Sequence, residues 1–442
     1  MSGDSVRHRQ RMSDTEWVRY ELGTLTAVPI RSGTYVPKNL RGRGSKLVNM
    51  GELFANPRLF DIEMERVPIS AEDELRFGLQ VGDLLFARRS MIGTGASQCS
   101  VVCALEHGSV FDSSLIRVRV DSSRVVPHFL FYFFWSPEGK AEVASIGRHG
   151  PISGITGKDL ATLSVPVPFL EEQRVIARVL GSLDDKIELN RRMNQTLEDI
   201  CRALFKFWFV DFGPVRAKKE GRWKKGESLP GMPADMWDLW PSEFEESEIG
   251  EVPKGWKVGH LEDLATVTMG QSPPGSTYNE EGEGVPFYQG VRDFSRRFPT
   301  RRVYCTAPSR FAEAGDVLLS VRAPVGRTNI ATEKCAIGRG LGSVRFRRGG
   351  ESFGLCLLNA QVEVWEALDA KGTVFGAATR DDVRKLPVLA PPDQFIERFE
   401  TFSKPVDCAL LAFHGESETL STVRDALLPK LLSGEIRVKV DA

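Results

Sequence analysis

The sequence carries one plan twice, and this repetition restricts the possible folds more than any other feature. GDLLFARRS (82–90) lies opposite GDVLLSVRA (315–323), and SKLVNMGELF (45–54) lies opposite VPFYQGVRDF (285–294). Further along, GPISGITGKDLATLSVPVP (150–168) matches TVFGAATRDDVRKLPVLAP (373–391). Chance similarity could explain any one such pair but does not readily explain a series in the same order, so the order predicts a duplicated architecture.

Each copy consists of a mixed region followed by a helix. The mixed regions hold short β-rich runs, LIRVRV (115–120) and GSVRFRR (342–348), between glycine and proline turns. Such a pattern is typical of compact α/β domains. The predicted fold class is therefore α/β, with two pseudo-repeated α/β domains separated by two long antiparallel coiled-coil helices.

The first of these helices has a seam of apolar residues that alternate by four and three positions, as in a heptad repeat. The seam residues are Ile176, Leu180, Leu183, Ile187, Asn190, Asn194, Leu197, Cys201, Leu204 and Trp208, with Leu410, Leu420, Leu427 and Leu431 in the second helix. The two asparagines would cost stability but fix the register. An ordinary amphipathic core helix is the alternative.

The helix ends are also predicted from residue type. Gly213, followed by Pro214, should end the first helix with a left-handed glycine cap. In the second helix, Pro405 and the HGE at 414–416 should break the seam and leave a separate short helix. Its last turn should be kinked or ended at Pro429 and capped near Ser433 and Gly434.

Composition excludes several classes of protein. A chain of 442 residues with 41% hydrophobic and 26% charged residues is globular and contains more than one domain. Its seven cysteines form no CxxC pair, which argues against a zinc site or a disulfide framework and favours a reducing cytoplasm. The most apolar run, FLFYFFW (129–135), is too short to cross a bilayer, so a soluble protein is expected.

Motifs for catalysis are missing from the sequence. It contains no HExxH, GxSxG or EF-hand pattern, and SGITGK (153–158) lacks the first glycine of a phosphate loop. The histidines at 107, 128, 149 and 260 have no ligand spacing. We therefore expect no active site, no metal site and no cofactor bound by this chain.

Side chains suited to DNA occur in both copies. The candidates in the first copy are Arg41, Arg43, Lys46, Asn49, Arg88, Arg89 and Ser90, and those in the second are Tyr288, Gln289, Arg292, Arg322, Arg327 and Arg339. Arginine can pair with guanine, and asparagine or glutamine with adenine. Arg88 and Arg322 stand out because each follows a Gly-Asp strand. Taken singly, any of these cations could equally be a solvated surface charge.

Two long motifs resemble a known family. The segment EEQRVIARVLGSLDDKIELNRRMNQTLEDICRALFKFWFVDFGPVRAK (171–218) resembles the central conserved region of the specificity subunits of type I restriction–modification systems. RDALLPKLLSGEIRV (424–438) resembles their distal conserved region. The resemblance covers essentially the whole chain.

The resemblance implies a division into four parts. Residues 14–165 and 251–385 would be target recognition domains, each reading one half of a split DNA target. Residues 166–250 would be the central conserved region, with a spacer helix at about 169–212, and 386–438 the distal region, with a helix at about 392–433.

The resemblance also implies partners for this chain. The spacer helices would set the gap between the half-sites and bind two modification subunits, which carry S-adenosylmethionine and methylate adenine. Restriction and motor subunits would complete the assembly. Phe207, Trp208 and Phe209 are candidates for the partner contact, or for packing against the second helix.

Two other interpretations stay open. The chain could be a scaffold whose helices recruit proteins and whose α/β domains bind no DNA, which agrees with a net charge of only -1. It could also be a degenerate copy that has lost its partners. A steep fall of DNA affinity with salt would separate a DNA-binding protein from a scaffold.

Overall fold

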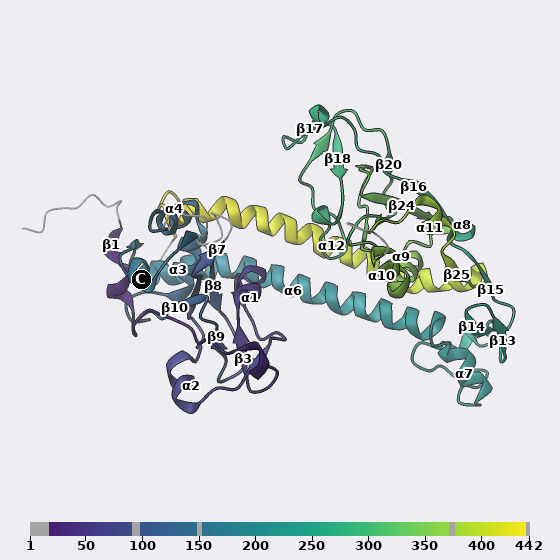
Figure 1. Ribbon diagram of the computed structural model, residues 1–442, viewed down its shortest axis with the longest axis horizontal. Coiled ribbons are helices and arrows are strands. Elements are labelled where there is room, and N and C mark those ends of the chain that lie inside the picture. Colours follow the sequence, from purple (N-terminus) through teal and green to yellow (C-terminus); the bar gives the residue numbers. More distant parts are fainter. Residues whose placement is uncertain (1–16, 91–97, 148–152, 371–375, 439–442) are drawn as a thin grey trace, which may run out of the picture. The chain divides into compact units, whose positions relative to one another are not determined.

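The computed structural model describes residues 17–90, 98–147, 153–370 and 376–438 (Figure 1). Contacts divide the chain into two units. Unit 1 comprises Met1–Asn190 with Gly415–Ala442, and unit 2 comprises Arg191–His414. Each unit therefore contains an α/β domain together with a part of each long helix.

The domain of unit 1 is built on a five-stranded sheet in the order β2-β10-β6-β8-β4, beside a three-stranded sheet with β3 between β5 and β9. The bounds are β2 Arg31–Ser32, β3 Ser45–Val48, β4 Arg58–Leu59, β5 Arg66–Val67, β6 Leu84–Ala87, β8 Cys99–Val102, β9 Val110–Phe111 and β10 Leu115–Val118. Strands β1 (Val18–Glu21) and β12 (Ser164–Val167) pair with each other, as do β7 (Arg89–Ser90) and β11 (Ser153–Gly154).

Short helices complete the domain of unit 1. They are α1 Met50–Ala55, α2 Ala71–Phe77, α3 Pro127–Trp135, α4 Pro137–Ser145 and α5 Gly157–Ala161. Helix α3 begins with a proline at a position where no backbone N–H is needed, and its residues 129–134 are all buried in the core. This burial shields the apolar side chains of the helix from solvent.

The domain of unit 2 repeats this topology. Strand β21 lies between β24 and β22, as β6 lies between β10 and β8, and β18 is antiparallel to β19 and parallel to β23, as β3 is to β5 and β9. The strand bounds are β13 Phe244–Ser247, β14 Gly250–Pro253, β15 Lys257–His260, β16 Ala265–Met269, β17 Tyr278–Asn279, β18 Val285–Tyr288, β19 Tyr304–Cys305, β20 Phe311–Ala312, β21 Val317–Ser320, β22 Thr328–Ile330, β23 Cys335–Ile337, β24 Leu341–Phe346 and β25 Pro387–Ala390. The short helices are α7 Gly213–Lys219, α8 Leu261–Leu264, α9 Glu351–Asn359, α10 Val362–Ala370 and α11 Arg380–Arg384.

The Gly-Asp motif that precedes β6 and β21 has the same structural role in both units. Gly82 and Gly315 have φ values of 91° and 89°, a conformation that suits glycine. Asp83 accepts two hydrogen bonds of 2.6 Å from Arg119. Asp316 accepts bonds of 2.7 and 2.9 Å from Arg345. Each pair ties the turn before one strand to the end of the neighbouring strand.

The two long helices are α6 (Leu170–Phe209) and α12 (Asp393–Leu432), drawn in teal and yellow in Figure 1. In unit 1 they run antiparallel, since Asp184 accepts from Arg424 at 2.7 Å while Asn190 donates to Glu416 at 2.8 Å. In unit 2 the end of α6 packs on the beginning of α12, where the rings of Phe205 and Phe399 are 5.9 Å apart. The predicted fold class is confirmed, and the domain boundaries stay predictions.

All the predicted seam residues of both helices are buried or half-buried. Asn190 is fully buried, and its amide reaches Glu416 and Ser417. An amide at this depth favours the register that gives its N–H groups these two acceptors, because a shift would remove them.

The second long helix corrects one prediction and confirms another. Helix α12 continues through Pro405 and residues 414–416, so no separate short helix forms. Phe399, Ser403 and Leu410 are buried on both sides of Pro405, and this packing outweighs the hydrogen bond that proline cannot donate. The helix does not end at Pro429 but at Leu432, directly before the predicted cap at Ser433 and Gly434. Beyond it, Gly434 has a φ of 73° and Ile436 N–H donates to the Lys430 carbonyl.

The end of the first helix differs from the prediction as well. The left-handed residue is Phe212, with a φ of 52°, whereas Gly213 begins α7. Glycine is needed at 213 for space, because a Cβ there would lie 1.9 Å from the ring of Phe207. Trp208 and Phe209 are buried, and their ring centroids lie 6.1 and 5.7 Å from that of Phe399. For these two residues the structure therefore supports packing against the second helix rather than contact with a partner protein.

Removing Asp83 or Asp316 should destabilise the unit that contains it. Asp83→Ala leaves the Arg119 guanidinium without its carboxylate, and we expect a loss of about 3 kcal/mol, as for other broken buried pairs. Asp316→Ala should act in the same direction through Arg345. Chemical denaturation measures the effect, with the exposed Asp238→Ala as the matched control. Equal stability of the three variants would contradict this role of the motif.

The buried Glu400 on α12 should make unit 2 sensitive to pH. Burial raises the pKa of this carboxyl to about 7, although the Phe353 N–H donates to it at 2.8 Å. Between about pH 4.5 and 7 the unfolded chain loses this proton while the folded unit keeps it, so stability falls as pH rises and then levels off. Glu400→Gln should remove the slope and add roughly 3 kcal/mol above pH 7.

The control for Glu400→Gln is Glu397→Gln, an exposed carboxylate one turn earlier on α12. Denaturation midpoints measured from pH 5 to 8 give the comparison. A stability gain of Glu400→Gln that does not depend on pH would refute the assignment.

Candidate nucleic-acid interface

Three segments of unit 2 meet at one edge of the domain and present polar side chains. Gly338 N–H donates to the Tyr288 carbonyl at 2.8 Å, and Val321 N–H donates to the Gly340 carbonyl at 2.9 Å. A Cβ on Gly340 would lie 2.2 Å from the carbonyl oxygen of Gln289. The chain around 288–289 and the chain around 321–322 are therefore both held against the turn 338–340.

Unit 1 has the same backbone frame. Asp112 N–H donates to the Val48 carbonyl at 2.9 Å, and Arg88 N–H donates to the Ser114 carbonyl at 2.8 Å. These bonds match those of Gly338 and Val321. The match makes Arg88 equivalent to Val321.

The strand after the Gly-Asp motif confirms this register. Arg89 pairs antiparallel with Gly154 in the β7–β11 ladder, and Arg322 makes an antiparallel bridge to Ala377. Arg89, rather than Arg88, is therefore the equivalent of Arg322, because the two strands reach their bridge at that residue. Both arginines are exposed, while Arg88 is half-buried and its guanidinium faces the Ser113 carbonyl at 3.4 Å.

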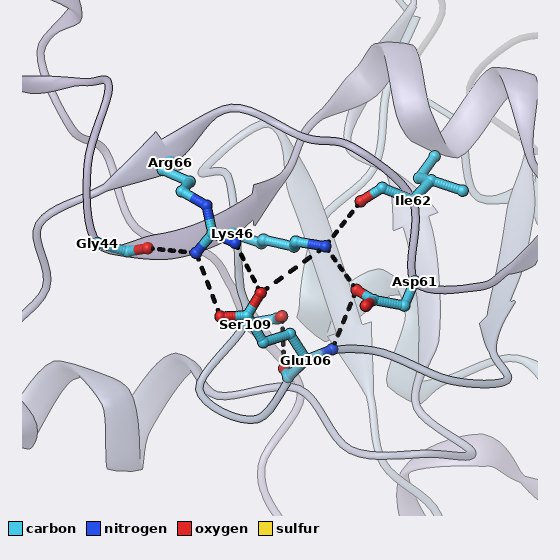
Figure 2. Close-up of polar contacts among 7 residues, drawn as sticks. All are labelled: Gly44, Lys46, Asp61, Ile62, Arg66, Glu106 and Ser109. Carbon is cyan, nitrogen blue, oxygen red and sulfur yellow. Dashed lines mark hydrogen bonds and ion pairs between the residues drawn. The ribbon is translucent and has the colours of Figure 1, made fainter. Parts of the chain in front are cut away.

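Several predicted DNA-binding residues of unit 1 already have partners inside the protein. Lys46 is 6% exposed and donates to Asp61 at 2.8 Å and to the Ile62 carbonyl at 3.0 Å (Figure 2). Arg41 pairs with Glu65 at 2.8 Å. The Asn49 side chain caps α1, where it accepts the Gly51 N–H. These contacts occupy the three side chains inside the protein and hold residues 41–49 in place.

The Lys46 network reaches the glycine-rich loop itself. Figure 2 shows Arg66 directed at the Gly44 carbonyl, to which it donates at 2.8 Å, while its guanidinium pairs with Glu106. The same Glu106 lies 3.7 Å from Lys46. Gly44 adopts a φ of 99°, and a Cβ there would meet the Val67 carbonyl at 2.4 Å.

Tyr288 in unit 2 is likewise internal. It is 1% exposed, and burial raises the pKa of its hydroxyl well above the usual value. Its backbone, through the bond to Gly338, contributes to the site more directly than its ring. Sequence could not reveal this, since a tyrosine at a strand end suits a core and a surface equally well.

The remaining predicted arginines and glutamine are exposed. This set comprises Arg43, Arg89, Gln289, Arg292, Arg322, Arg327 and Arg339. Within residues 17–90, 98–147, 153–370 and 376–438, no side chain of this set forms an ion pair. Ser90 ends β7 beside Arg89. Exposed guanidiniums free of carboxylates are suited to phosphates and to guanine edges.

The first part of the arginine-rich run 296–302 contacts the two long helices. Arg297 is 9% exposed and pairs with Asp407 of α12, and Phe298 is buried with its ring 5.0 Å from that of His414. Arg296 lies 3.5 Å from Glu198 of α6. Within unit 2 this loop therefore attaches the α/β domain to both long helices.

The part of the chain that the structure describes contains no group of histidine, cysteine and carboxylate side chains that could hold a metal ion. His128 Nε2 lies 3.8 Å from the Cys103 thiol, and burial lowers the pKa of its imidazole. His149 lies outside the described residues.

Among the residues that are described, no helix is both long and apolar enough to traverse a bilayer.

Gly340→Ala should damage this surface selectively. The new methyl group would collide with the Gln289 carbonyl, and we expect a loss of about 1–3 kcal/mol in the stability of unit 2. Gly290→Ala is the matched control, because its Cβ would meet nothing within 4 Å. Thermal unfolding of both variants decides, and similar melting temperatures would show that the close approach is unimportant.

Comparisons with known proteins agree on one family. A model described as the type I restriction modification DNA specificity domain matches residues 76–199. The putative type I restriction enzyme MjaX specificity subunit of Methanocaldococcus jannaschii is 30% identical over 432 residues, which cover 96% of this chain and 94% of that protein. The type I restriction enzyme HindI specificity subunit of Haemophilus influenzae is 26% identical, with 96% and 100% covered.

Among solved structures, the S subunit of a type I restriction–modification system from M. genitalium has a similar fold. The TM-score is 0.55 at 15% identity, and the match covers 96% of this chain and 97% of that one.

Proposed function

Because the chain belongs to the family of type I restriction enzyme specificity subunits, whose role is DNA sequence recognition, we propose that it reads a two-part DNA target with one half assigned to each unit. The observation that carries this proposal is the repeated backbone frame. Each frame carries an exposed arginine at the same position, Arg89 or Arg322, and the frame of unit 2 also carries the exposed amide of Gln289. Two such surfaces on one chain suit two separate stretches of duplex.

The chain itself acts without catalysis or cofactor in this proposal. Its partners are double-stranded DNA, two modification subunits that carry S-adenosylmethionine and methylate adenine, and the restriction subunits of the full assembly. The spacer helices α6 and α12 recruit the modification subunits and set the gap between the half-sites.

An exposed stripe that occurs once in each unit supports the recruitment of two modification subunits. On α6, within unit 2, Thr196, Ile200 and Ala203 are exposed at helical spacing. On α12, within unit 1, Thr419, Val423 and Ala426 have the same spacing and are also exposed. Ile200 is 55% exposed and Val423 is 41% exposed. Repeated apolar groups on the outer face of a helix are suited to a protein partner.

The proposal is tested by mapping methylated adenines in the DNA of a host that expresses this chain together with a modification subunit. A split motif that appears only when this chain is present supports the proposal and supplies the target. If all proteins are soluble and co-purify but no new methylation appears, the scaffold or degenerate interpretation is correct.

Arg89→Ala and Arg322→Ala should each weaken recognition of a different half-site. Each side chain belongs to one frame, so we expect roughly 10-fold or greater weakening for duplexes that contain only the affected half. Competition binding with half-site duplexes measures this. If either variant weakens both halves equally, or neither, the assignment of one half to each unit is wrong.

Ile200→Asp and Val423→Asp should each remove one modification subunit from the complex. A carboxylate on the apolar stripe would have to be desolvated at the interface, which is costly. Native mass spectrometry should find one partner with either single variant and none with the double variant. Val210→Asp, an exposed position near the end of α6, is the control, and two partners bound to the double variant would exclude the stripes.

A further inference from the structure

The two interfaces share a backbone frame but differ in their charged side chains. The frame aligns Asn49 with Gln289, Glu52 with Arg292, Arg88 with Val321, Arg89 with Arg322, and Ser113 with Arg339. Two of these positions change from an uncharged or acidic residue in unit 1 to an exposed arginine in unit 2.

Position 292 can hold an arginine because Asp293, the next residue, makes the hydrogen bond that Glu52 makes in unit 1. In unit 1 the Glu52 carboxylate accepts the Asn49 N–H at 3.0 Å and completes the cap of α1. In unit 2 the equivalent N–H, that of Gln289, donates at 2.6 Å to Asp293, which is buried. The carboxylate that holds this backbone has moved by one residue, and Arg292 is left exposed.

The second difference moves a guanidinium between two adjacent segments. In unit 1, Arg88 lies between β6 and β7, where it is half-buried and faces the Ser113 carbonyl. In unit 2 the equivalent position, directly after β21, holds the buried Val321, and the arginine is in the turn 338–340, as the exposed Arg339. The cation that is folded back in unit 1 is therefore directed outward in unit 2.

From these two substitutions we propose that Arg292 and Arg339 are the specificity-determining residues that make the second half-site differ from the first, by pairing with guanines on either side of the contact made by Gln289. This inference rests on the proposed function. A guanidinium bonds to O6 and N7 of guanine with two parallel hydrogen bonds, which neither the serine nor the glutamate of unit 1 can reproduce. Arg89 and Arg322 make the contact that both halves have in common.

The test uses the complex with its modification subunits and the target found by methylation mapping. Variants Arg339→Ser, Arg339→Lys and Arg292→Gln compete for duplexes in which each base pair is changed in turn. Arg339→Ser installs the residue that unit 1 has in this place. Arg339→Lys keeps the charge but removes the planar fork. Lys257→Ser, an exposed cation on β15, which pairs with β25 instead of these segments, is the control.

We expect Arg339→Ser and Arg339→Lys each to abolish roughly 10-fold or greater discrimination at one G·C pair of the half-site that Arg322→Ala affects. Arg292→Gln should act at another pair of the same half-site. Uniform weakening over all duplexes would indicate phosphate contacts, and full discrimination by Arg339→Lys would show that the planar fork is not needed. Either result would overturn the inference. If the wild-type complex itself shows no preference for any duplex, the proposed function fails as well, and this result differs from both.

Discussion

The pairing of α6 with α12 is the interaction on which both units depend, because each unit contains a segment of both helices. In unit 1, Leu428, Leu431 and Leu432 of α12 belong to the same core as the aromatic helix α3. In unit 2, the core joins Phe205 and Phe209 of α6 to Phe399 and Leu410 of α12. Residues from the end of the chain thus complete the core of the first domain, and neither helix can be removed without exposing apolar surface in both units.

The duplicated charges show how the two halves have diverged on a common frame. Asp184 and Asp407 occupy equivalent places in the two long helices. Asp184 receives its cation, Arg424, from the opposite helix, whereas Asp407 receives Arg297 from the α/β domain. In both places the carboxylate is paired with an arginine, but a different part of the structure supplies it. Likewise, Asp293 accepts the backbone N–H bond in unit 2 that Glu52 accepts in unit 1, so position 292 can hold an arginine.

The architecture therefore separates what is held constant from what varies. Backbone hydrogen bonds, the Gly-Asp turns and the helix seam are repeated, while the side chains that project from the frame differ between the units. A recognition protein built in this way can change its target through exposed residues without losing stability, since surface substitutions usually cost little free energy.

Sequence by itself determined the duplication, the α/β class and the two long helices, since these follow from local patterns. The heptad predicted a long helix, the family resemblance put it at about 169–212, and α6 spans 170–209. Tertiary structure alone decided that Pro405 lies within a continuous helix and that Lys46 and Tyr288 are buried. It also decided that Arg89 of unit 1, rather than Arg88, occupies the position of Arg322 in unit 2. Each of these outcomes depends on contacts between residues far apart in the chain. Helical periodicity is encoded within a few turns, whereas burial and strand register are set by the free energy of the whole packed unit.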